Sequence, residues 1–80
     1  MLKLTVKETF ILINCETGSE DKVVDELSKM DKISEIQKIL GVYDVIAKLE
    51  ADSESDIKDV ISSKIQKIHP INSVVTLSTK

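Results

Sequence analysis

The tetrapeptide Gly41-Val42-Tyr43-Asp44 is the part of the sequence whose residue types and spacing best fit a binding site. It lies between two short apolar segments that read as antiparallel strands. Gly41 permits a tight turn whose backbone N–H groups can point outward at a carboxylate, and Asp44 offers an anion for an ammonium group. Together these groups complement a zwitterion. The same residues also fit an ordinary hairpin, in which Tyr43 caps the core and Asp44 bonds to the turn backbone.

Residues suited to catalysis or metal binding are scarce. The single histidine, His69, follows the second predicted helix, where the helix dipole favours a surface position. The single cysteine, Cys15, has no arginine to activate it, since the chain contains none, and we interpret it as an inert thiol. One histidine and one cysteine cannot supply the three or four ligands of a zinc site. We therefore expect no enzyme activity, no metal and no cofactor.

Composition narrows the class of protein further. The 80 residues are enough for one domain, 1–80 with its core at 8–79, and 41% hydrophobic with 31% charged residues is an ordinary globular mixture. The net charge is −3 and the basic residues are scattered lysines, so we expect no direct binding of nucleic acid. No apolar run approaches the ~18 residues that cross a bilayer. A lone cysteine and the lack of a signal-like segment indicate a cytoplasmic location.

Apolar periodicity divides the chain into four strands and two helices. The second helix has the clearest start and stop signals, an N-cap at Ser53 and a terminating Pro70. The order predicts the α+β class: a ferredoxin-like βαββαβ fold, with a four-stranded antiparallel sheet, its first and third strands central, and two helices on one face. The expected elements are strand 8–15, helix 19–30, strands 33–40 and 44–50, a second helix from the Ser53 cap to Ile68, and strand 71–79.

The first strand is apolar on both faces, although the two helices cover only one. The helix-free face would be a contiguous apolar patch of a kind that soluble monomers usually hide. We therefore expect a homodimer that packs sheet against sheet, with an interface at Phe10, Ile11, Leu12, Ile13 and Ile46. Alternatively, the first strand is buried by its own helices and by a curled arm from residues 1–6, in which Leu2, Leu4 and Val6 alternate with polar residues.

In the stretch from Ile33 to Ala51, an apolar residue, a glutamate and an apolar pair precede GVYD. This stretch resembles the effector-binding and oligomerisation domain of the Lrp/AsnC transcription regulators, also called the RAM domain. The resemblance covers about residues 8–79 and includes Thr76 on the terminal strand. It implies an amino-acid effector, dimerisation through the sheets, and assembly of dimers into tetramers or octamers. The effector would bind between dimers, near the GVYD turn.

The resemblance also implies roles for single residues. The backbone of Gly41, Val42 and Tyr43 would contact the ligand carboxylate, Asp44 would hold its amino group, and the Thr76 hydroxyl would lie nearby. The helix-turn-helix domain of the family has no counterpart here, so the sequence resembles a stand-alone module that could modulate a full-length Lrp/AsnC-type regulator by mixed assembly. Two alternatives stay open: a purely structural oligomerisation protein without a ligand, and a small dimeric α/β-barrel enzyme.

Overall fold

The computed structural model describes residues 7–78, and within them the elements follow the predicted β-α-β-β-α-β order. The sheet is antiparallel throughout, with the strand order β2-β3-β1-β4. This confirms the ferredoxin-like α+β fold and the central position of the first and third strands. The N-terminal arm expected from Leu2, Leu4 and Val6 lies outside the described residues. The elements are β1 (Lys7–Cys15), α1 (Glu20–Ser28), β2 (Ile33–Lys38), β3 (Val45–Ala51), α2 (Glu54–Val60), a π-helix η1 (Ile61–Ile65) and β4 (Ile71–Ser78).

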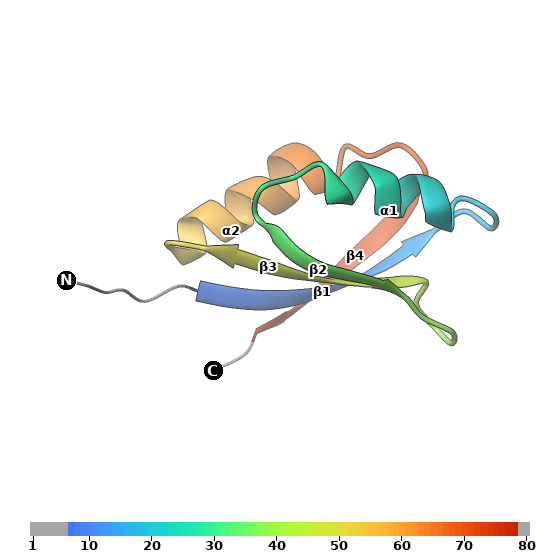
Figure 1. Ribbon diagram of the computed structural model, residues 1–80, viewed down its shortest axis with the longest axis horizontal. Coiled ribbons are helices and arrows are strands. Elements are labelled where there is room, and N and C mark those ends of the chain that lie inside the picture. Colours follow the sequence, from blue (N-terminus) through green and yellow to red (C-terminus); the bar gives the residue numbers. More distant parts are fainter. Residues whose placement is uncertain (1–6, 79–80) are drawn as a thin grey trace.

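Both helices lie on the same side of the sheet, as Figure 1 shows. Val23 and Leu27 of α1 and Ile57 and Val60 of α2 are buried against the sheet. They meet the alternate residues of β1 and β3 that point toward the helices. Because successive residues of a strand point to opposite faces, the remaining side chains of β1 and β3 lie on the other face, which we call the open face.

The second helix begins as its sequence predicts and ends differently. Ser53 Oγ accepts a hydrogen bond from the backbone N–H of Asp56 at 3.1 Å, so the predicted N-cap is present. The periodicity predicted one continuous helix to Ile68, but after Val60 the helix widens into η1, where the Gln66 N–H donates to the Ile61 carbonyl at 2.9 Å. The wider turn changes no assignment of the core, since Ile61 and Ile65 both stay buried.

The first strand separates its two faces sharply. Ile11 and Ile13 are 0% exposed beneath the helices, whereas Phe10 and Leu12 on the open face are half-buried. The prediction that Ile11 and Ile13 lie in a dimer interface was therefore wrong. That prediction rested on the apolar character of both faces of the first strand. The face that carries Ile11 and Ile13 is buried in the core of the subunit, so only the other face is available to a partner.

The structure has no helix within residues 7–78 that is long and apolar enough to span a membrane.

Replacing Ile11 by alanine should lower the free energy of unfolding by about 2–5 kcal/mol, because it opens a cavity in a fully buried site. Replacing the exposed Lys7 on the same strand should change it by less than about 0.5 kcal/mol. Urea unfolding of both variants measures this difference. A loss at Ile11 that disappears as the protein is diluted would place this side chain between subunits and contradict the burial seen here.

Candidate ligand-binding site

The connection between β2 and β3, residues 39–44, forms a turn that projects past one end of the sheet (Figure 1). The Ile39 N–H donates to the Asp44 carbonyl at 2.9 Å and closes the turn. Gly41 has a φ of +124°, a conformation that residues with a side chain rarely adopt. The space around Gly41 is open, so the backbone conformation rather than crowding requires glycine here.

The tip of the turn carries apolar side chains that the subunit itself does not cover. Leu40 is 100% exposed and Val42 is 80% exposed, whereas Tyr43 is half-buried. Exposed aliphatic side chains on both sides of Gly41 cost free energy in water, and a surface of this kind often marks a contact with a ligand or another protein. The tip of the turn therefore presents exposed apolar side chains on both sides of Gly41.

Asp44 joins the turn to the end of the first strand. Its backbone N–H donates to the Ile13 carbonyl at 2.9 Å, and its carboxylate Oδ2 accepts the backbone N–H of Cys15 at 2.8 Å. A carboxylate has about four lone-pair positions, so this bond leaves capacity for a further donor such as an ammonium group. The Asp44 carboxylate thus bonds to β1, while the backbone carbonyl of Asp44 bonds within the turn.

The neighbouring thiol is kept in its neutral form. Burial raises the pKa of Cys15, and the negative charge of Asp44 raises it further. Because the thiolate is the nucleophilic form, a raised pKa makes Cys15 a weak nucleophile at neutral pH. This agrees with its interpretation as an inert thiol.

Thr76 does not lie near the turn within one subunit. It stands opposite Ile11 on β4 and faces the helix side, where it lines a groove of about 230 Å³. Ile57 and Ile61 form the apolar part of that groove, and Glu54 and Lys58 also line it. The turn is at the other side of β1, beyond Ile13. A site that includes both Thr76 and the turn therefore needs two subunits.

The open face carries a continuous band of apolar side chains across three strands. Three of the residues predicted at the interface belong to it: Phe10, Leu12 and Ile46, each half-buried. The strand register places Leu77 beside Phe10 and Val75 beside Leu12, with exposures of 46% and 37%. We call these five residues the apolar band: Phe10, Leu12, Ile46, Val75 and Leu77.

Sequence reasoning missed Val75 and Leu77. The last strand reads Ser-Val-Val-Thr-Leu from residue 73, with apolar residues on both faces, so alternation alone does not identify its open face. Only pairing with β1 shows that Val75 and Leu77 continue the row begun by Phe10 and Leu12. The exposed Leu40 was likewise assigned to a strand, and the structure places it in the turn.

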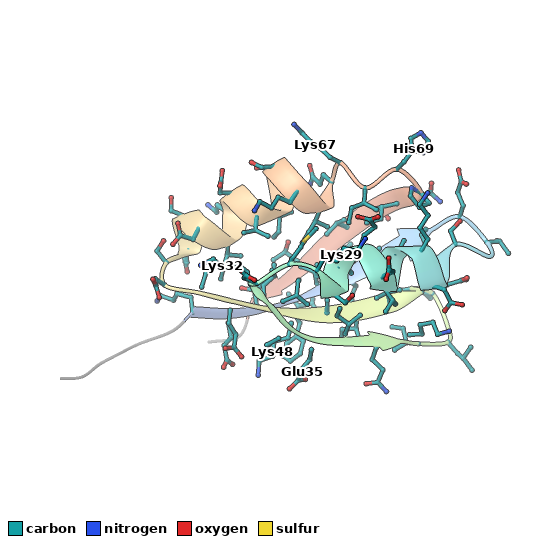
Figure 2. All side chains as sticks on the ribbon, turned by 45° about the horizontal axis from the view of Figure 1, so that its top comes forward. Lys29, Lys32, Glu35, Lys48, Lys67 and His69 are labelled. Carbon is teal, nitrogen blue, oxygen red and sulfur yellow. The ribbon has the colours of Figure 1, made fainter. Side chains whose placement is uncertain are left out.

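Charged residues bound the apolar band at one end. Lys48 lies over the Phe10 ring, with Nζ 5.9 Å from the ring centroid, and forms ion pairs with Glu8 at 3.6 Å and Glu50 at 3.7 Å. Figure 2 shows Lys48 and Glu35 close together on the side of the sheet away from the helices. The open face therefore has an apolar centre with a charged margin, as many protein interfaces do.

The side chains that could support catalysis are not brought together. His69 is exposed and points away from the sheet on the helix side, as Figure 2 shows. Cys15 lies buried at the end of β1. Among residues 7–78, no three side chains of the metal-binding types form a cluster. On the open face of the two central strands, Phe10, Leu12 and Ile46 are apolar, whereas Lys48 and Glu50 are charged.

Comparison with known proteins assigns the family. The model of the Lrp/AsnC ligand binding domain matches residues 8–79, nearly the whole chain. The chain belongs to the Lrp/AsnC ligand-binding domain family. No curated protein matches this Lrp/AsnC domain significantly.

Several solved structures share this fold over most of the chain. FFRP-DM1 is 31% identical with a TM-score of 0.89, and the alignment covers 92% of this chain and 99% of that one. A hypothetical protein from Pyrococcus horikoshii, PHS023, is 32% identical with a TM-score of 0.87, covering 95% and 90%. AsnC from E. coli shares the fold at 23% identity and a TM-score of 0.86. This alignment covers 99% of the present chain and 58% of AsnC.

The buried Cys15 should make the stability of this Lrp/AsnC domain sensitive to alkaline pH. Its pKa is raised above the ordinary value of 9.0 in the folded state, so the unfolded chain loses the thiol proton first. The stabilisation is therefore complete below about pH 9 and is lost as the pH rises above it. The difference in unfolding free energy between the wild type and Cys15→Ala, measured by urea unfolding from about pH 7 to about pH 10.5, should shrink at the alkaline end. A difference that is constant over this range would contradict the raised pKa, since lysine titration is common to both proteins.

Proposed function

We propose that this domain binds an amino acid at the Gly41–Asp44 turn and assembles into oligomers, and that it acts as a regulatory module. The observation that carries the proposal is the geometry of the turn in a domain of this family. The turn projects beyond one end of the sheet, Gly41 has a φ of +124°, and the Asp44 carboxylate is anchored to β1. Because this carboxylate is already held in place, it loses little conformational entropy when it binds a cation.

The two ends of an amino acid find complementary groups in the turn. Backbone N–H groups of Gly41, Val42 and Tyr43 would donate to the ligand carboxylate, and Asp44 would accept its ammonium group. The chain has no arginine, so recognition of the carboxylate would depend on backbone donors. The exposed Leu40 and Val42 would add apolar contacts to an aliphatic ligand.

A second subunit would complete the site. Ligand sites usually enclose most of a small molecule, whereas the turn projects outward from one end of the sheet. The Thr76 groove lies apart from the turn of its own subunit, which supports a site made from the turn of one subunit and Thr76 of another. Ligand binding and assembly would then be coupled, because the ligand binds only the assembled form.

The apolar band supports assembly through the open faces. Packing two open faces would bury Phe10, Leu12 and Ile46 of both copies, and each CH₂ removed from water contributes roughly 0.8 kcal/mol. Dimers formed in this way would join into tetramers or octamers at the projecting turns. NMB0573, a transcriptional regulator from Neisseria meningitidis whose crystal structure is a complex with L-Met, shares the fold at 8% identity and a TM-score of 0.84. We further propose that the domain modulates a full-length Lrp/AsnC-type regulator by mixed assembly, within the cytoplasm.

One observation favours a second function, oligomerisation without a ligand. The Asp44 carboxylate already accepts the Cys15 N–H, so its presence has a sufficient structural explanation. In that case the domain would form the same assemblies and respond to no metabolite.

Titration against the twenty amino acids should reveal a selective rise in melting temperature and a measurable heat of binding. At a ligand concentration of 100 times Kd, binding to the folded state adds about 2.7 kcal/mol of stability. Calorimetry and thermal unfolding measure both effects. Flat traces for all twenty amino acids would contradict sensing and leave the ligand-free alternative.

Asp44→Asn is the informative variant for this site. The amide oxygen can still accept the Cys15 N–H, but the charge that would hold an ammonium group is gone. We expect binding to weaken at least about tenfold, a loss of about 1.4 kcal/mol, with little change in stability. Asp44→Ala is a poorer test, since it leaves the Cys15 N–H without this acceptor at a cost of about 1–3 kcal/mol.

The control is Asp31→Asn, which removes an exposed carboxylate outside the turn. This variant should bind the amino acid as the wild type does.

Leu12→Lys should dissociate the open-face dimer, because it places a charge at the middle of the apolar band. Gln37→Lys, on the same face but on the edge strand β2, is the control and should weaken association far less. Sedimentation velocity across micromolar concentrations measures the assembly state. If the wild type sediments as a monomer at high micromolar concentration, the open faces do not associate.

A further inference from the structure

Thr9 is a buried polar side chain whose hydroxyl has no hydrogen-bond partner in the described part of the subunit. It lies on the helix side of β1 and is 7% exposed, the one polar residue among the buried residues of the range 7–78. No hydrogen bond joins its hydroxyl to any other group within that range. Buried hydroxyl groups in folded proteins nearly always have a partner, because an unpaired one costs free energy. This hydroxyl therefore has an unused capacity to bind.

The space that Thr9 lines is the Thr76 groove, with a volume of about 230 Å³. Strand pairing sets Thr76 opposite Ile11, two residues along from Thr9 on the same face, so the two threonines are diagonal neighbours. Diagonal neighbours lie about 7–8 Å apart, which puts both hydroxyls within reach of one ligand group. A single water needs only roughly 10–15 Å³ of such space. The groove therefore has room for the side chain of a small molecule.

The lining of the groove changes from buried to exposed along its depth. Thr9, Ile57 and Ile61 are buried, whereas Glu54 and Lys58 are exposed. Among the described residues, neither Glu54 nor Lys58 forms an ion pair, so charged groups of both signs are available at the exposed end. Burying a charge beside Thr9 would cost more than one hydroxyl can offset. A ligand in the groove would thus keep its charges at the exposed end and bury an uncharged group.

We propose that the side chain of the bound amino acid enters this groove and ends in an uncharged polar group, an amide or a hydroxyl, that bonds to Thr9. The proposal rests on the proposed function, in which the Thr76 groove of one subunit faces the turn of another. A threonine hydroxyl both donates and accepts, so Thr9 suits either group. Thr9 is then a specificity-determining residue, because an apolar side chain of the same shape would leave its hydroxyl unpaired.

Titration with matched pairs of amino acids tests this selectivity. Threonine and valine are similar in shape, as are asparagine and leucine, and glutamine and methionine, so each pair differs mainly in hydrogen bonding. In the pair that binds best, calorimetry should give the polar member a Kd at least about tenfold lower than that of the apolar member. Thr9→Val should remove this preference by weakening the polar member alone. Thr9→Ser keeps the hydroxyl and should retain the preference.

Two results of the titration would overturn the proposal, and they differ in what they leave standing. Apolar members that bind as tightly as their polar counterparts would overturn the role of Thr9 and leave the proposed function intact. Heats that are flat for every amino acid would overturn both. A preference that persists in Thr9→Val would also exclude Thr9 as the residue that selects the ligand.

Thermal unfolding of the protein without ligand gives a second readout. Thr9→Val should melt no lower than the wild type, because it removes a buried hydroxyl that has no partner. A fall of more than about 4 °C would show that the subunit already satisfies this hydroxyl, and it would overturn the proposal. Circular dichroism of each variant establishes that the fold is intact.

Discussion

The burial of alternate side chains from β1 and β3 beneath the two helices is the constraint on which the other features of this domain depend. Ile11, Ile13, Val45 and Leu49 are fully buried there, and the period of two along each strand then fixes which residues face the other way. Since that other face also carries Phe10, Leu12 and Ile46, the domain has more apolar surface than its own helices can cover. This excess supports the proposed association with another chain.

The same constraint positions the candidate site. β1 and β3 are paired up to Ile13 and Val45, so the turn before β3 is held against the end of β1. The Asp44 carboxylate completes this attachment through the Cys15 N–H. The residue that would recognise an ammonium group is therefore also a residue that orients the turn. Its fixed position would favour the proposed binding, and because it also holds the turn, its removal would disturb the fold as well as the site.

Two surfaces of the domain are suited to contacts with other copies: the apolar band and the projecting turn. They lie on different sides of the subunit, and a small domain that uses more than one of them can form closed assemblies larger than a dimer. Small domains gain more from such contacts than large ones, because a short chain buries a smaller fraction of its own surface.

The sequence by itself determined the order of the elements, the fold, the Ser53 cap and the family, because each depends on local spacing or on a short motif that neighbouring residues define. It also located the turn through Gly41. Tertiary structure alone decided which apolar residues are available to a partner. Ile11 and Leu12 are indistinguishable by composition, and only the position of the helices buries one and leaves the other at the surface. The same holds for Val75 and Thr76, whose places depend on the register with β1, and for Asp44, whose partner is 29 residues away in the chain. Contacts between distant segments are set by packing of the whole core, which no local pattern encodes.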